Sequence, residues 1–232
     1  MKNIFVFSVV IFSFWKGFSQ IPVYPDAGMW NTFSLEKPIN QKFSFVFVEE
    51  IRLRENFTRL NLFYTNIGAS YKPFEFMKVS FVYRHIDKWI YEQKNFSYRH
   101  RLMLDIAVRK KVPPLILTYR HRLQAEERDL FTSDDGMLPE WFSRNKIDVK
   151  LDLGKRYAPY IGAEFRYQLS DPRNPLDNNG WHRGRYYAGV DCEINKNSSF
   201  GVYYLTQQFY NSAYSPEELY ILGLEYSLTL EG

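Results

Sequence analysis

Apolar and polar residues alternate with a period of two through most of this chain. In residues 96–109 every second position from Leu102 to Val108 is apolar, and the opposite face carries Asp105 and Arg109. Successive side chains of a β-strand point to opposite faces, so this alternation predicts strands with one apolar and one polar face. The chain is therefore expected to be all-β.

Ten segments show this pattern, and most have about the length of a membrane-crossing strand. They are residues 42–54, 59–69, 76–84, 96–109, 115–127, 144–153, 160–169, 183–194, 200–210 and 219–230, with a weaker candidate at 30–35. Short connections such as "NKNS" alternate with long ones such as "IDKWIYEQKN" and "SDPRNPLDNNG". Outer-membrane barrels alternate in this way between periplasmic turns and extracellular loops. The predicted fold is an antiparallel up-and-down transmembrane β-barrel of ten to twelve strands, with its C-terminus in the periplasm.

The start of the chain has the pattern of an export signal. Lys2 precedes the apolar stretch Ile4–Trp15, which is shorter than the roughly 20 residues that a membrane anchor needs. We expect a signal peptide at residues 1–19, an N-terminal arm or first strand at 20–41, and the barrel at 42–232. The expected location is the bacterial outer membrane.

Composition supports a membrane barrel and excludes several other classes. Aromatic residues make up 19% of the chain, yet the mean hydropathy is −0.40, as when lipid-facing and lumen-facing residues average out. Loss of Lys2 and Lys16 with the signal would leave 28 of the 30 basic residues against 26 acidic ones. This balance excludes nucleic-acid binding, which needs a basic domain or stripe. The single Cys192 excludes an internal disulfide framework, and the sequence indicates no cofactor.

The sequence "YRHRL" occurs twice, at residues 98–102 and 119–123. A turn centred near Lys110 and Lys111 would pair the two strands so that side chains of the same kind meet. The predicted cross-strand pairs are Arg101 with Arg120, Arg99 with Arg122, and His100 with His121. Four arginines would then face the lumen side by side. Because like charges placed opposite each other are destabilising, these arginines need carboxylate partners.

We interpret the polar faces of the strands as a charged lumen. The predicted cluster contains Arg99, Arg101, Asp105, Arg120, Arg122, Glu126, Arg144, Asp148, Glu164, Arg166, Arg185 and Asp191. Arginine suits such a network because its planar guanidinium binds carboxylates bidentately. A second interpretation is a site for an anionic solute, such as a phosphate or a sugar acid. The expected partners are therefore membrane lipids and small anionic solutes.

Histidines offer the remaining candidate chemistry. The two histidines of the repeat fall near the end of an apolar face, where an aromatic girdle belongs, and no third metal ligand accompanies them. A lipid hydrolase would need a nucleophile beside a histidine base, and the candidates are Ser80, Ser97, His85 and His182. No Gly-x-Ser-x-Gly motif is present, so we expect a narrow pore or a small-anion-binding barrel. An outer-membrane lipid hydrolase and a soluble periplasmic barrel that binds a partner stay as alternatives.

Several stretches of the chain resemble the domain of unknown function 2490 family. They are "SYRHRLMLDI", "TYRHRLQAEERD", "EWFSRNKIDVKLDLGKRYAPYIGAEFRYQL" and "WHRGRYYAGVDCEINKNSSFGVYYL". The resemblance covers most of the chain after the signal. It implies an exported barrel of Bacteroidota or other Gram-negative bacteria, and it carries no catalytic residues because the family has no established activity. One departure is the C-terminus Leu230-Glu231-Gly232, where many outer-membrane barrels end on an aromatic residue.

Overall fold

A computed structural model describes residues 24–128, 139–172, 179–210 and 217–231. The predicted signal peptide lies outside these residues. The described chain forms eleven strands: β1 (Tyr24–Pro38), β2 (Phe43–Arg54), β3 (Arg59–Phe74), β4 (Met77–Ile90), β5 (Asn95–Val112), β6 (Leu115–Arg128), β7 (Glu140–Leu151), β8 (Tyr157–Ser170), β9 (Gly180–Asn195), β10 (Ser198–Phe209) and β11 (Glu217–Thr229). The prediction left residues 20–41 as either an N-terminal arm or a first strand, and the structure shows that residues 24–38 of this segment form a strand.

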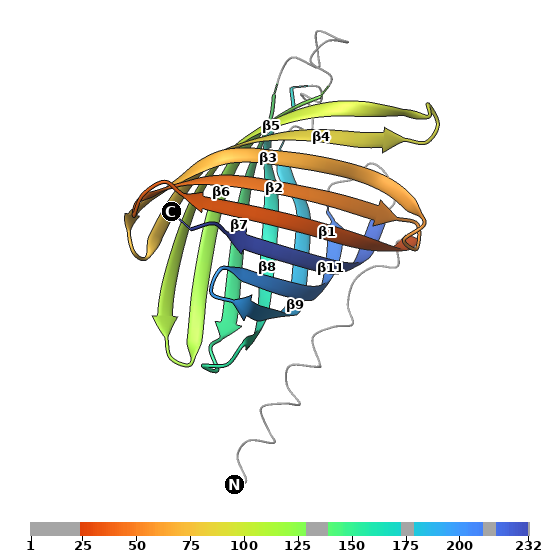
Figure 1. Cartoon of the computed structure of the whole chain (residues 1–232). Coiled ribbons are helices and arrows are strands. Elements are labelled where there is room, and N and C mark those ends of the chain that lie inside the picture. Colours follow the sequence, from red (N-terminus) through yellow and green to blue (C-terminus); the bar gives the residue numbers. More distant parts are fainter. Residues whose placement is uncertain (1–23, 129–138, 173–178, 211–216, 232) are drawn as a thin grey trace.

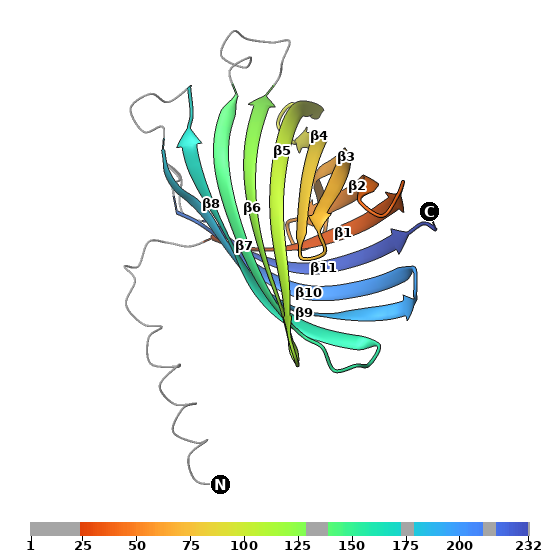
Figure 2. The same cartoon turned by 90° about the vertical axis from the view of Figure 1, so that its left-hand side faces the viewer.

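The eleven strands close into one barrel, which confirms the predicted all-β barrel of ten to twelve strands (Figure 1). Consecutive strands pair in antiparallel fashion, but β1 and β11 pair in parallel, which the prediction of a wholly antiparallel barrel did not include. The parallel pairing of β1 with β11 follows from the odd number of strands, because the first and last strands then run in the same direction. Figure 2 shows β5 to β8 rising steeply while β9 to β11 and β1 cross toward the other side.

The two ends of the barrel differ in their connections. At one end, which we call the short-turn end, strands are joined by residues 39–42, 75–76, 113–114, 152–156 and 196–197, and β11 ends there too. The other, long-loop end has the connections around residues 129–139, 171–179 and 210–216. The predicted alternation is confirmed at these connections, with two exceptions at the long-loop end, where short turns of residues 55–58 and 91–94 join β2 to β3 and β4 to β5. "IDKWIYEQKN" is mostly strand, because Trp89 of β4 packs on Phe96 of β5 (ring centroids 4.8 Å apart) and only residues 91–94 form the turn.

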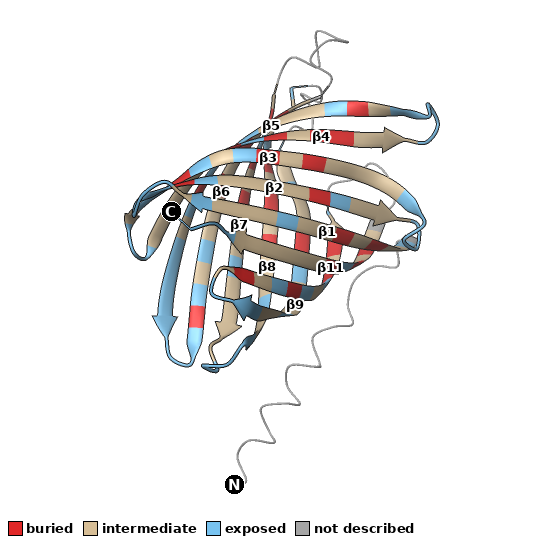
Figure 3. Ribbon diagram, in the orientation of Figure 1, coloured by how far each residue is buried: buried red, intermediate tan, exposed pale blue. Residues whose placement is uncertain are grey.

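Exposed and buried residues alternate along the strands, as Figure 3 shows. On β5, Leu102 and Leu104 are 47% and 43% exposed, whereas the intervening Met103 is 1% exposed. The apolar faces therefore point outward and the polar faces point into the lumen, the reverse of a water-soluble barrel. Among the described residues there is no helix with the length and apolar character of a membrane span.

Candidate functional site

The predicted register of the two YRHRL strands is wrong. Arg101 of β5 pairs with Glu126 of β6 instead of Arg120, and the other pairs shift with it. The two lysines assigned to the turn belong to β5, and the hairpin turns at Pro113 and Pro114, which have no N–H to continue the ladder. The partner strand is displaced by six positions, and because six is even every side chain keeps its predicted face. The observed pairs include Arg101 with Glu126, Asp105 with Arg122, and Ile106 with His121.

Four arginines nevertheless lie side by side, on a different set of strands. Arg122, Arg144, Arg166 and Arg183 of β6 to β9 are successive cross-strand partners. Asp105 of β5 continues the row and accepts two hydrogen bonds of 2.6 Å from the guanidinium of Arg122. Since adjacent like charges repel, this row depends on carboxylates in the rows on either side of it.

Glu164 on β8 is the carboxylate that joins three lumenal arginines. Its Oε1 accepts hydrogen bonds from Arg144 at 2.5 Å and from Arg185 at 3.0 Å, and its Oε2 accepts one from Arg120 at 2.7 Å. The three guanidinium groups come from β6, β7 and β9, so one buried carboxylate links four strands. Charge-assisted hydrogen bonds of this kind are about twice as strong as neutral ones.

Glu126 on β6 has the same role nearer the long-loop end. Its carboxylate lies 2.7 Å from Arg101, 3.3 Å from Arg166 and 3.5 Å from Arg99. The fully buried Gln124 donates a further hydrogen bond to it at 3.1 Å. Arginines from β5 and β8 are thereby held by a carboxylate of β6.

The lumen is filled around these two carboxylates, and we call this region the filled half. Its buried side chains include Met103, Arg122, Gln124, Glu126, Glu140, Phe142, Arg144, Glu164, Arg166, Gln168 and Gln207. A void of about 10 Å³ lies beside Arg144 and Arg166, about the space of one water molecule. A void of this size is too small for a solute.

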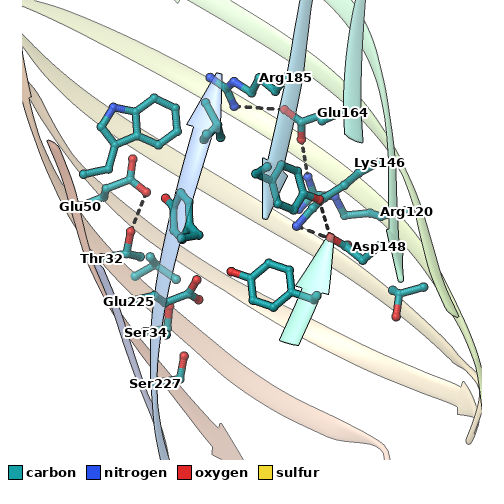
Figure 4. Close-up of a pocket in the computed structure, with 18 of the residues that line it drawn as sticks. Thr32, Ser34, Glu50, Arg120, Lys146, Asp148, Glu164, Arg185, Glu225 and Ser227 are labelled. Atoms are coloured by element: carbon teal, nitrogen blue, oxygen red, sulfur yellow. Dashed lines mark hydrogen bonds and ion pairs between the residues drawn. The ribbon is translucent and has the colours of Figure 1, made fainter. Parts of the chain in front are cut away.

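The rest of the lumen holds a cavity of about 720 Å³, which we call the cavity half. It extends from the filled half toward the short-turn end, where Ser34, Ser199 and Ser227 line it. Figure 4 shows Glu225, Ser227 and Thr32 on one side of it, and Lys146 and Asp148 on the other. Its volume falls within the range of about 300–1,000 Å³ that is usual for small-molecule sites.

The lining of the cavity carries more positive than negative charge. Its basic residues are Arg52, Arg84, Arg109, Arg120, Arg122, Arg144, Lys146, Lys150 and Arg185, and its carboxylates are Glu50, Asp148, Glu164, Asp191 and Glu225. Three of these carboxylates form local ion pairs: Glu50 with Arg52, Asp148 with Lys146, and Asp191 with Lys150. A surplus of one sign inside a low-dielectric wall attracts solutes of the opposite sign.

Arg84 on β4 contributes a buried charge that has no carboxylate within ion-pair distance among the described residues. It is 7% exposed, its Nε donates to Asn66 at 2.6 Å, and its guanidinium carbon lies 3.5 Å from the centroid of the Tyr64 ring. Its cross-strand neighbour on β5 is another arginine, Arg101. A buried cation with no carboxylate at ion-pair distance is costly, so an anion bound in the cavity beside Arg84 would be stabilised.

The two repeat histidines lie on the outer face and are not cross-strand partners. His100 pairs with His85 of β4 (ring centroids 5.2 Å apart), and its Nδ1 lies 2.6 Å from the hydroxyl of Tyr83. His121 lies 3.0 Å from the Oδ1 of Asn145. Nowhere in the described ranges do three His, Cys, Asp or Glu side chains gather as a metal ion would require.

The residues considered for a hydrolase do not come together. Ser80 faces the lumen as the cross-strand partner of Asp105, whereas His85 faces outward, 3.3 Å from Asp87. His182 packs edge-on against the rings of Phe142 and Phe209. The candidate nucleophile Ser80 and the base His85 thus lie on opposite faces of β4. Ser97 also faces the lumen.

Several lumenal residues were missed by the sequence prediction. Arg84 was placed on a polar face but left out of the cluster, and Glu140 was assigned to a loop. Tyr160 and Tyr187 also line the cavity, whereas the predicted lumenal cluster contained only charged residues. The alternation of faces would have identified both tyrosines as lumenal. Tyr160 lies four positions before Glu164 and Tyr187 lies two positions after Arg185, so each shares a face with a predicted lumenal residue.

The chain matches a known protein family over most of its length. The model of a family described as a protein of unknown function, DUF2490, matches residues 27–217. This range includes all of β2 to β10, and hence nearly all of the residues that line the lumen. A search of curated proteins finds no match.

Proposed function

We propose that this chain, which belongs to the DUF2490 family of proteins of unknown function, is an outer-membrane β-barrel that binds a small anionic solute in its lumen. The observation that carries the membrane part is the outer surface of the barrel. Every strand exposes apolar side chains there: Phe33, Phe45, Ile67, Phe81, Leu104, Leu117, Ile147, Ile161, Val190, Val202 and Leu222 are one from each. In water this would form an apolar patch far larger than the few hundred Å² that soluble monomers expose.

Aromatic pairs at both ends support the same location. Phe43 stacks on Tyr71 near the short-turn end, with ring centroids 4.7 Å apart. Trp89 packs on Phe96 at the long-loop end of β4 and β5. Aromatic girdles of this kind lie at the two membrane interfaces of outer-membrane barrels. A closed barrel also pairs its backbone groups between strands, as crossing a bilayer requires.

The two halves of the lumen favour binding over conduction. By the usual orientation of outer-membrane barrels, the short turns face the periplasm and the longer loops face the outside. The cavity half then opens to the periplasm, and the filled half separates it from the exterior. The surplus of basic side chains around the cavity, with Arg84 at its inner end, supports an anion as the bound solute.

Cell fractionation tests the membrane part. We expect the full chain, expressed in a Gram-negative host, to be recovered in the outer membrane and to migrate faster on gels before boiling than after. Recovery in the soluble periplasmic fraction would overturn the membrane assignment and support the soluble barrel instead.

Phosphate titration of the purified chain tests the anion part. We expect inorganic phosphate to raise the unfolding temperature, while sodium chloride of equal ionic strength does not. Replacing the buried charge, Arg84→Gln, should weaken phosphate binding about tenfold, because truncating one partner of a buried charge pair is costly. Arg156→Gln, in the exposed turn after β7, is the matched control and should bind like the parent chain. Equal stabilisation by both salts would refute a site that selects phosphate over chloride.

A further inference from the structure

Three tyrosines form one wall of the cavity. Tyr160 of β8, Tyr187 of β9 and Tyr203 of β10 line it, and we call them the tyrosine wall. Each of them has a glycine as at least one of its cross-strand neighbours. Gly189 lies between Tyr160 and Tyr203, and Gly223 is the other neighbour of Tyr203. Rings and glycines therefore alternate around this side of the barrel.

The glycines make room for the rings. A Cβ on Gly189 would lie 2.7 Å from the Cβ of Tyr203 and 2.8 Å from the Cζ of Tyr160, and a Cβ on Gly223 would overlap the ring of Tyr203. A Cβ on Gly162 would overlap the side chain of Tyr187 in the same way. Each ring thus packs against the backbone of a neighbouring strand and borders the cavity. Contacts between rings and glycines can also serve to bend a sheet. A purely structural role of this kind would not require a cavity beside the rings.

Polar side chains flank the tyrosine wall on both sides. Toward β7, the ammonium groups of Lys146 and Lys150 lie 5.0 Å and 5.7 Å from the ring centroids of Tyr187 and Tyr160. Toward β11 and β1, the lining consists of hydroxyls and a carboxylate: Thr32, Ser34, Ser199, Glu225 and Ser227 (Figure 4). The cavity therefore offers an aromatic surface, hydrogen-bonding groups and positive charge together.

We infer that the ligand is an acidic sugar, a pyranose ring that carries one carboxylate or phosphate. The inference rests on the proposed function and names the class of its anion. The apolar C–H face of a sugar ring packs on aromatic side chains, and its hydroxyls match the serines, threonine and glutamate of β10, β11 and β1. Its anionic group fits Arg84 at the inner end of the cavity. A bare anion would use the charge but leave the tyrosine wall without a partner.

Three probes separate the two parts of such a ligand. D-glucuronate has both the ring and the charge, glucose has the ring alone, and acetate has the charge alone. Their binding is measured on the purified full chain by tryptophan fluorescence, since Trp30 lines the cavity, at constant ionic strength. We expect glucuronate to bind about tenfold more tightly than either of the other two.

A pair of variants on β10 tests the tyrosine wall. Tyr203→Leu removes a ring from the cavity, and Tyr204→Leu removes one from the outer face, where Tyr204 is 53% exposed. We expect Tyr203→Leu to weaken glucuronate binding about fivefold, because ring contacts contribute about 1 kcal/mol. Acetate binding should stay unchanged, which also shows that the variant is folded. Tyr160→Leu replaces it if Tyr203→Leu does not fold.

The outcomes distinguish this inference from the proposed function. If acetate or phosphate binds as tightly as glucuronate, the anion site stands and the sugar is ruled out. If glucose equals glucuronate, the ligand is a sugar but not an acidic one, and the inference fails. If none of the three probes binds but phosphate does, the inference fails and the anion site stands, and if phosphate does not bind either, both fail. An equal loss of glucuronate binding in the Tyr203 and Tyr204 variants would contradict a role of the tyrosine wall.

Discussion

The filled half and the cavity half of the lumen are built on the same strands, yet one excludes a solute and the other leaves space for one. On β8 the side chains of Arg166 and Gln168 are buried in the filled half, Glu164 lies at the boundary and also lines the cavity, and Tyr160, four positions nearer the short-turn end, belongs to the cavity half. The two halves differ in the length of the side chains that point into the lumen. Long polar side chains that meet a carboxylate fill the barrel, whereas glycines let rings lie along the wall.

The two halves also balance charge differently. In the filled half the buried carboxylates Glu164 and Glu126 each hold three arginines. In the cavity half most ion pairs are one to one, and Arg84 has no carboxylate partner among the described residues. Removing a carboxylate from the first half should therefore cost stability, whereas removing a charge from the second should affect binding.

The largest effect is expected from breaking the ion-pair network where the filled half meets the cavity. Glu164→Gln leaves Arg120, Arg144 and Arg185 without their shared carboxylate, and loss of one partner of a buried ion pair costs about 3–5 kcal/mol. The free energy of unfolding in lipid vesicles, from denaturant titration, measures this loss. Glu193→Gln, exposed near the short-turn end, is the control. A loss below about 1 kcal/mol would mean that the network does not hold the strands together.

A second prediction concerns the lipid that surrounds both halves. Leu104→Arg places a charge in the middle of the apolar face of β5 and should cost about 2–4 kcal/mol of unfolding free energy in vesicles. His100→Arg, four positions nearer the long-loop end, should cost about 0–1 kcal/mol because it lies at the interface. Equal effects of the two substitutions would show that the outer face is not in lipid.

A third prediction tests why the cavity half stays open. Gly162→Ala forces the Tyr187 side chain away from Asp148, to which its hydroxyl donates a hydrogen bond, and overpacking of this kind costs about 1–3 kcal/mol. Gly201→Ala is the control, because its Cβ would meet only the movable Oδ1 of Asp191 at 2.9 Å. Thermal unfolding in micelles measures both. A larger loss for Gly201→Ala would contradict the role assigned to the ring.

The smallest effect on stability is expected at the inner end of the cavity. Arg84→Gln removes a contact with Tyr64 and a hydrogen bond to Asn66, but it also removes an unneutralised charge. We expect the unfolding free energy to change by less than about 1.5 kcal/mol, since the two contributions oppose each other. Denaturant titration in the absence of added phosphate measures it. A loss as large as that of Glu164→Gln would mean that Arg84 belongs to the filled half.

The sequence predicted the faces of the strands well, because a period of two is a local property. His100 and Arg101 are neighbours in the chain, and their opposite faces follow from alternation alone. The barrel class and the alternation of connections followed from the same pattern. The parallel contact between β1 and β11 did not, because a weak first strand left the strand count between ten and twelve.

The pairing of side chains across strands could not be predicted with the same success. It depends on where each hairpin turns, and the displacement of one turn to Pro113 and Pro114 moved Arg101 from Arg120 to Glu126. The row of arginines on β6 to β9 results from three successive registers, each set by its own turn. The cavity could not be predicted from the sequence either. It depends on glycines such as Gly189, which make room for tyrosines of neighbouring strands, and this requires knowledge of the strand pairing.

Thiol labelling tests most directly the claim that the cavity opens to the periplasm and is closed toward the exterior. In a Cys192→Ala background, Ser227→Cys places a thiol in the cavity and Thr58→Cys places one in the exposed turn at the long-loop end. A membrane-impermeant maleimide added to intact cells should label only Thr58→Cys, and after the outer membrane is made permeable it should label both. Labelling of Ser227→Cys in intact cells would contradict the account, because the reagent would have had to pass the filled half.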